Sequence, residues 1–220
     1  MLSELMKNKK CIAVAGSHGK TTTTSFVGNI LESAKLDPTI VNGGIINSLS
    51  KNNKFGKGKW MVVEADESDG SFLKLPHEIS VLTNLDIEHL DYYKTPKNLF
   101  FSFEKFIMNL PFYGTSIVNE DDKNLKKIIQ KNDTRRIITF SVKNKKSNVF
   151  VDKIYFDNQY SYFTLNFNFP DNKLSKSYSY KLKASGLHNV YNGTASIIAG
   201  HLVGVKNSFI KNALKNYIGV

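Results

Sequence analysis

The sequence predicts an α/β fold in which a mostly parallel sheet is flanked by helices and is followed by a small antiparallel β subdomain. Short apolar runs alternate with longer segments of helical periodicity, a pattern typical of strand–helix–strand units around a parallel sheet. From about residue 148 the pattern changes to alternating apolar and polar residues rich in Tyr and Phe, which indicates an antiparallel meander. The 220 residues are enough to bury one large core.

The predicted elements follow in chain order. The strands of the parallel sheet are the apolar runs Cys11–Ala15, Trp60–Ala65, Ile79–Asn84, Thr115–Asn119 and Arg136–Ser141. A helix is predicted in "KTTTTSFVGNILESA", and another begins at Pro96 with Thr95 as its N-cap. The antiparallel strands occupy approximately 148–184, and helical periodicity returns in "HNVYNGTASIIAGHLV" and "NSFIKNALKNYI".

The composition restricts the partners and the compartment. The formal net charge is +11, but the lysines are scattered among asparagines and form no basic stripe, so we expect no nucleic-acid partner; nucleic-acid binding stays an alternative. No run approaches the roughly 20 apolar residues of a membrane span, and the first ten residues lack the apolar core of a secretory signal. The single cysteine, Cys11, excludes a disulfide framework. A cytoplasmic location is expected, with no membrane partner.

The stretch "AGSHGKTTTT" predicts a phosphate-binding loop between the first strand and the first helix. A phosphate needs converging N–H donors, a compact cation and close approach of the backbone. The candidate residues are Gly16, Ser17, His18, Gly19, Lys20, Thr21 and Thr22. In this hypothesis Lys20 reaches the terminal phosphates and the Thr21 hydroxyl binds Mg²⁺; a glycine-rich turn with an exposed lysine is the alternative.

Four carboxylates lie at the end of the second predicted strand, in "WMVVEADESDGSF": Glu64, Asp66, Glu67 and Asp69. Mg²⁺ prefers oxygen ligands, and in nucleotide sites it takes one or two carboxylates together with phosphate oxygens. Glu64 is nearest the strand end and is the first choice as ligand. Ser68 and Asp69 are candidates for substrate contact, and an acidic solvated loop is the alternative.

The third predicted strand runs into "TNLDIEHLDYY", which places His89 among carboxylates just beyond the strand. A histidine there can bind a second cation or orient a phosphate, although a purely structural histidine is the alternative.

The stretch "SGLHNVYNGTAS" places His188, Asn189 and Asn192 in the opening turn of a helix. The two asparagines are three residues apart and share a face, and their amides offer the donor and the acceptor that an adenine edge requires. Capping of the helix by Ser185 or Asn189 is the alternative.

Taken in order, "AGSHGKTTTTS", "VNGG", "VVEADESDGSFL", "TNLDIEHLDYY", "NLPFYG" and "GLHNVYN" resemble the central ATP-binding domain of the Mur ligase family, over nearly the entire chain. "EADESDGSFL" followed by "HLDYY" favours the branch that joins L-alanine to UDP-N-acetylmuramate. The family has the shorter loop pattern G-[TS]-x-G-K-T, in which Ser17 replaces the commoner threonine.

The resemblance implies roles for these residues in an ATP-dependent amide synthesis through an acyl phosphate. Lys20 would neutralise the γ-phosphate, Thr21 and Glu64 would hold a first Mg²⁺, and His89 would bind a second. The resemblance also implies that His188, Asn189 and Asn192 contact the adenine and the ribose. It implies that His18, Ser68 and Asp69 face the muramyl substrate.

The resemblance also implies that residues 1–220 are one central domain, without the N-terminal UDP-binding domain and the C-terminal domain of a complete ligase. We therefore expect this fragment to be incomplete as an enzyme. A nucleotide-binding module without ligase activity, or another Mur-type ligase, is the alternative.

Overall fold

The structure is a computed structural model that describes residues 4, 6–43, 53–131, 135–169 and 176–218. Gly44 of the "VNGG" motif and residues 170–175 of the predicted antiparallel region lie outside them. Within the described residues, nine strands form one sheet in the order β2-β3-β1-β4-β5-β6-β7-β8-β9. Their bounds are β1 Lys10–Ala15, β2 Thr39–Val41, β3 Trp60–Glu64, β4 Ile79–Leu82, β5 Thr115–Asn119, β6 Arg136–Ser141, β7 Val149–Phe156, β8 Ser161–Phe167 and β9 Lys176–Leu182.

The five predicted parallel strands are confirmed, and the antiparallel region continues the same sheet. All pairs from β2 to β7 are parallel, whereas β7–β8 and β8–β9 are antiparallel. β7 is the junction, because Val149 pairs in parallel with Phe140 on one side and opposes Phe167 on the other. The three last strands therefore extend the main sheet and do not form a second one.

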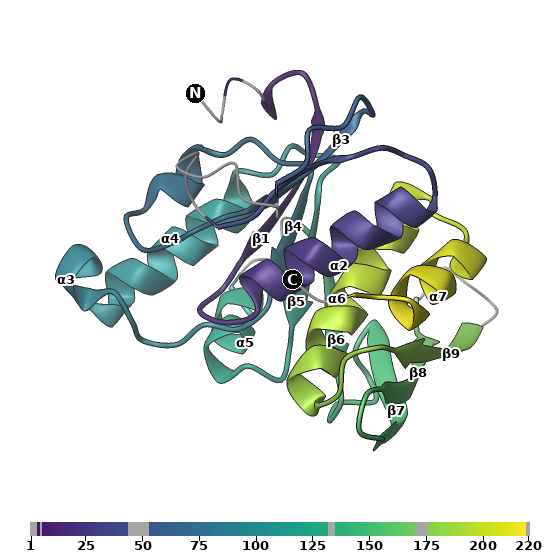
Figure 1. Ribbon diagram of the computed structural model, residues 1–220. Coiled ribbons are helices and arrows are strands. Elements are labelled where there is room, and N and C mark those ends of the chain that lie inside the picture. The colour runs from purple at the N-terminus through teal and green to yellow at the C-terminus, as the bar shows by residue number, and fades with distance from the viewer. Residues whose placement is uncertain (1–3, 5, 44–52, 132–134, 170–175, 219–220) are drawn as a thin grey trace.

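Helices cover both faces of the sheet (Figure 1). Their bounds are α2 Lys20–Ser33, the 3₁₀ helix η1 Ser71–Lys74, α3 Leu90–Tyr93, α4 Pro96–Met108, α5 Lys123–Ile129, α6 Leu187–Val203 and α7 Asn207–Lys215. α2, α6 and α7 share one hydrophobic core with the sheet, and α4 and α5 share another. Among the described residues, no helix has both the length and the apolar character needed to cross a membrane.

The central strand β1 shows how the sheet separates the two cores. Ile12 and Val14 belong to the core beneath α2 and α6, whereas Ala13 and Ala15 belong to the core beneath α4 and α5. This alternation follows from the two-residue period of a strand, and a strand buried on both faces reads as a continuous apolar run.

The N-terminus of α4 confirms the predicted cap. Thr95 has extended backbone angles, its hydroxyl accepts a hydrogen bond from the backbone N–H of Asn98 at 3.2 Å, and Pro96 occupies the first turn. The missing N–H of proline costs nothing there, because that position has no partner within the helix.

The strand order places a crevice at the carboxyl end of β1. β1 lies between β3 and β4, so the chain leaves it toward one side of the sheet and later returns on the other. In open α/β sheets, such a reversal of strand order is where ligands bind.

Candidate functional site

A glycine-rich loop, residues 16–19, joins the end of β1 to the start of α2. Gly16 has φ +133° and Gly19 has φ +82°, conformations that glycine adopts without steric cost. A Cβ at Gly16 would lie 2.2 Å from Thr83 Oγ1, so a side chain has no room there. Gly19 is the N-cap of α2 and makes no side-chain cap, so the first turn presents backbone N–H groups to an anion.

The end of β4 fixes the shape of this loop. The backbone N–H of His18 donates to Asn84 Oδ1 at 2.8 Å, and Asn84 Nδ2 donates back to the carbonyl of His18 at 2.9 Å. The Thr83 hydroxyl donates to the same carbonyl at 2.7 Å. The Ser17 hydroxyl accepts from the N–H of Asp86 at 2.8 Å. The loop is therefore held on the sheet by side chains from a neighbouring strand end.

Lys20 forms an ion pair with Glu67 inside the site. Its ammonium lies 3.1 Å from Oε1 and 3.0 Å from Oε2 of Glu67, and it donates to the carbonyl of Gly16 at 2.7 Å. The Glu67 residue is only 1% exposed. Burial raises the pKa of Glu67, and the charge of Lys20 opposes that rise. The hydroxyl of Tyr93 donates to the Glu67 carbonyl, which fixes the backbone of this segment.

Thr21 and Glu64 meet at the predicted magnesium site. The Thr21 hydroxyl lies 3.1 Å from Oε1 and 3.0 Å from Oε2 of Glu64, and the N–H of Gly43 donates to Oε2 at 2.7 Å. They meet because β1 and β3 are parallel neighbours, with Val14 paired to Glu64. A hydroxyl beside a carboxylate is a donor set that suits Mg²⁺.

His89 is the N-cap of α3 and has the left-handed backbone angle φ 56°. Its carbonyl accepts from the N–H groups of Tyr92 and Tyr93, each at 3.0 Å. No contact among the described residues joins its ring to Thr21 or Glu64, so a second cation at His89 stays a prediction.

His18 lies in an exposed cluster of titratable groups at the outer rim of the loop. Its Nε2 lies 3.2 Å from Asp86 Oδ2 and 3.7 Å from Glu88 Oε1. A protonated imidazole attracts both carboxylates, which repel each other, and water screens these interactions because the side chains are 42–66% exposed.

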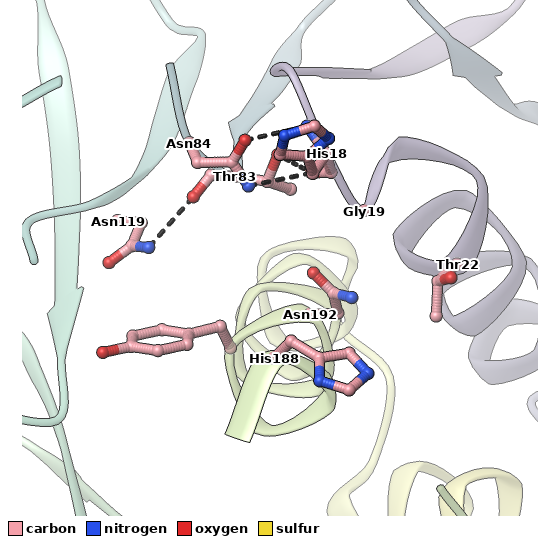
Figure 2. Close-up of a pocket in the computed structure, with 9 residues that line it drawn as sticks. His18, Gly19, Thr22, Thr83, Asn84, Asn119, His188 and Asn192 are labelled. Atoms are coloured by element: carbon pink, nitrogen blue, oxygen red, sulfur yellow. Dashed lines mark hydrogen bonds between the residues drawn. The ribbon is translucent and has the colours of Figure 1, made fainter. Parts of the chain in front are cut away.

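A pocket of about 350 Å³ lies beside the loop (Figure 2). Figure 2 shows His188 and Asn192 on α6, between Thr22 of α2 on one side and Asn119 on the other. The residues that line it are His18, Gly19, Thr22, Thr83, Asn84, Asn119, His188, Tyr191 and Asn192. The structure thus brings two of the three predicted adenine-contacting residues into one pocket with the loop.

The third of those residues, Asn189, is not among the residues that line this pocket. Its amide donates to the carbonyl of Ser185 at 2.9 Å and stabilises the turn before α6. The alternative interpretation, capping by Ser185 or Asn189, is wrong: the N-cap is Gly186 and has no side-chain cap, because the Ser185 hydroxyl donates to the carbonyl of Asp157 instead.

Ser68 and Asp69 lie in the turn between β3 and η1. The N–H of Ser68 donates to Asp66 Oδ1 at 2.9 Å, and the N–H of Ser71 donates to Asp69 Oδ1 at 2.8 Å. Hydrogen bonds from Ser71 lower the pKa of the Asp69 carboxyl. These bonds account for the local turn, and contact with a substrate stays a prediction for both residues.

Sequence reasoning named Glu67 only as one of four carboxylates and gave it no role, and it assigned no role to Thr83, Asn84, Asn119 or Tyr191. Asn119 ends β5, and Thr83 and Asn84 directly follow β4, so their position at carboxyl ends of parallel strands is a signal that could have found them. Nothing local distinguishes Glu67 from the carboxylates beside it.

The loop, with Lys20 and Thr21 opening the helix that follows it, takes the place of the phosphate-binding loop of P-loop-type α/β domains, and the fold and the site assign the chain to this class. A family model described as the Mur ligase middle domain matches residues 14–200. The chain therefore belongs to the Mur ligase family, as a middle domain.

Two curated relatives that are more than 40% identical to the chain have the same name. The chain is 41% identical over 220 residues to the UDP-N-acetylmuramate--L-alanine ligase of Pelagibacter ubique (strain HTCC1062), covering 100% of this chain and 47% of the relative. It is 42% identical over 223 residues to the ligase of the same name from Rhodopseudomonas palustris (strain BisA53), with the same coverage. The chain spans about half the length of these curated relatives. Among solved structures, UDP-N-acetylmuramate-alanine ligase MurC from Thermotoga maritima is similar with a TM-score of 0.80 and 27% identity, over 99% of this chain and 47% of that one.

Proposed function

We propose that the chain is the ATP-binding domain of a cytoplasmic ligase that joins L-alanine to UDP-N-acetylmuramate in peptidoglycan precursor synthesis. The observation that carries the proposal is the convergence of Lys20 with the Thr21–Glu64 pair at the uncapped start of α2. The names of the relatives support the substrates. Cys11 is buried, and burial raises its pKa to about 12, so its thiol takes no part in this proposal.

The chemistry that this proposal assigns is phosphoryl transfer followed by acyl transfer. The lactyl carboxylate attacks the γ-phosphorus of ATP, so that ADP leaves and an acyl phosphate forms; the amine of L-alanine then displaces phosphate. Phosphoryl transfer depends mostly on positioning and charge neutralisation. A bound Mg²⁺ would supply positive charge that offsets the charge of the phosphates.

The residues divide this work by position. Thr21 and Glu64 hold Mg²⁺, the loop N–H groups bind the phosphates, and Lys20 turns from Glu67 toward the γ-phosphate. His188 and Asn192 contact the nucleoside from α6. In this proposal His89 binds a second Mg²⁺, and His18, Ser68 and Asp69 face the muramyl substrate.

Replacing Glu64 by glutamine is expected to weaken binding of Mg-ATP about tenfold or more, because an amide is a poorer ligand for Mg²⁺ than a carboxylate. Glutamine keeps the size of the side chain, so binding of ATP in the presence of a chelator should change little. Calorimetric titration with and without Mg²⁺ measures both. Asp66→Asn is the matched control, since Asp66 holds the N–H of Ser68 and not Thr21. Equal Mg-ATP affinity in Glu64→Gln and the parent chain would remove Glu64 from the metal site.

A chimera tests whether this chain can carry out the phosphoryl-transfer part of the ligase reaction. If this chain replaces the matching middle part of the Pelagibacter ubique ligase, we expect phosphate release that requires both UDP-N-acetylmuramate and L-alanine, because every residue assigned to phosphoryl transfer lies in this chain. The same chimera with Lys20→Met controls for contaminating ATPases and should release at least about a hundredfold less phosphate. Absence of phosphate release from a chimera that folds would contradict the assignment of phosphoryl transfer to this chain.

A further inference from the structure

The pocket shares His18 and Gly19 with the loop, but it lacks the charged side chains of the predicted phosphate and magnesium site. Lys20, Thr21 and Glu64 are not among its lining residues, and the lining contains no lysine, arginine, aspartate or glutamate. Its polar groups are amides, hydroxyls and imidazoles. Such a lining does not compensate phosphate charge, but it does suit a flat, neutral group with polar edges.

Most polar side chains of the pocket already have partners within the protein. Both amide atoms of Asn84 bond to the backbone of His18. The Asn119 amide donates to the carbonyl of Thr83 at 2.9 Å and accepts from the N–H of Asp121 at 3.1 Å. Among the described residues, no hydrogen bond is made by the side chains of Asn192 or His188, although Asn192 is only 6% exposed. In the part of the chain that the structure describes, the Thr22 hydroxyl also makes no hydrogen bond, so the side chains left to bind a ligand are Thr22 on α2 and His188 and Asn192 on α6.

Tyr191 lies on the same helix, and its hydroxyl is already bonded. It donates to Asp121 Oδ2 at 2.9 Å, and Asp121 also accepts from the Ser141 hydroxyl at 2.6 Å and from the N–H of Val142 at 2.8 Å. The ring packs against Phe140 with centroids 6.4 Å apart. Burial and the bond to Asp121 raise the pKa of Tyr191, so the hydroxyl remains a donor. What Tyr191 offers the pocket is thus a ring held in one orientation.

We propose that the ring of Tyr191 is the wall against which the nucleotide base packs, and that it contributes to affinity for the nucleoside but not for the phosphates. This inference rests on the proposed function. An aromatic ring recognises the face of a base, while the unpaired amide of Asn192 is left to read its edge. The anchoring to Asp121 and Ser141 lowers the entropy that the ring loses on binding.

The test compares Mg-ATP with magnesium tripolyphosphate, which has the phosphates but no nucleoside, by calorimetry on this chain. Tyr191→Leu should weaken the affinity for Mg-ATP about tenfold, which is the effect of one lost stacking contact. The affinity for tripolyphosphate should stay within about twofold of that of the parent chain. Tyr191→Phe keeps the ring and should retain most of the Mg-ATP affinity. Tyr162→Leu is the matched control, because Tyr162 also donates its hydroxyl to an aspartate, Asp157 at 2.9 Å, but does not line the pocket. Tyr162→Leu should leave the affinity for both ligands unchanged.

The outcomes separate this inference from the proposed function. Equal weakening of both ligands in Tyr191→Leu, or no weakening of either, overturns the role of the ring. Tripolyphosphate binding as tight as Mg-ATP to the parent chain also overturns it, while leaving the phosphate-binding loop in place; this comparison does not depend on the folding of any variant. If neither ligand binds the parent chain, the proposed function fails and the inference fails with it.

Discussion

Replacing Lys20 by methionine is expected to weaken Mg-ATP binding about a hundredfold or more, because it removes the positive charge that the proposed function assigns to the γ-phosphate. The same change should lower the free energy of unfolding by about 3 kcal/mol, since it leaves the buried carboxylate of Glu67 without its counter-ion. The side chains of Lys20 and Glu67 are only 14% and 2% exposed, so water screens their attraction weakly. Calorimetry and urea denaturation measure the two effects.

The dependence of this loss on pH follows from the pKa of Glu67. Burial raises that pKa, and removal of Lys20 takes away the charge that opposes the rise. A carboxyl whose pKa is raised by folding contributes stability that is complete below its unfolded-state pKa and is lost as the pH rises through its folded-state pKa. The destabilisation by Lys20→Met should therefore be larger at about pH 8 than at about pH 5.

The double variant Lys20→Met/Glu67→Gln provides the control for the ion pair. It removes both charges and should recover most of the lost stability, while Mg-ATP affinity stays low. If the double variant is as unstable as the sum of the two single variants, Lys20 and Glu67 are not coupled.

Replacing Gly16 by alanine is expected to lower the free energy of unfolding by about 3 kcal/mol and to abolish measurable phosphate binding. The new Cβ would lie 2.2 Å from Thr83 Oγ1 and 2.7 Å from the carbonyl of Asn84, and φ +133° is strained for any residue with a side chain. The loop must then move off the end of β4, which disrupts the converging N–H groups. Urea denaturation and tripolyphosphate titration measure the outcome.

Gly204→Ala separates backbone strain from collision. Gly204 also has a positive φ, +90°, but a Cβ there would meet nothing within 4 Å. Gly204→Ala should lower the free energy of unfolding by only about 1 kcal/mol and leave phosphate binding unchanged. Equal losses of stability in the two variants would show that collision with Thr83 and Asn84 contributes nothing at Gly16.

Much of the fold could be predicted because its signals are local. Thr95 and Pro96 mark the start of α4 within two residues, and the apolar run that begins at Cys11 is recognisable without its neighbours. The phosphate-binding loop is similar in this respect, since its glycines, lysine and strand–turn–helix setting are contiguous in sequence.

What could not be predicted depends on residues far apart in the chain. The ion pair of Lys20 with Glu67, rather than with another carboxylate of the same stretch, depends on how β1 and β3 lie side by side. The three-residue strand β2 is too short to give a pattern, and the predicted second sheet region joined the first because β7 pairs with β6. In the sequence Tyr191 cannot be told from an aromatic residue of the core, because its hydroxyl bonds to Asp121, which is far away in the chain.

The amide of Asn84 has a kinetic consequence. The Asn84 amide bonds to both the N–H and the carbonyl of His18. The loop therefore loses its conformational entropy when the chain folds and not when a nucleotide binds. Capture of the phosphates then requires no slow rearrangement of the loop, and we expect the association rate to follow solvent viscosity, as it does when diffusional encounter is limiting.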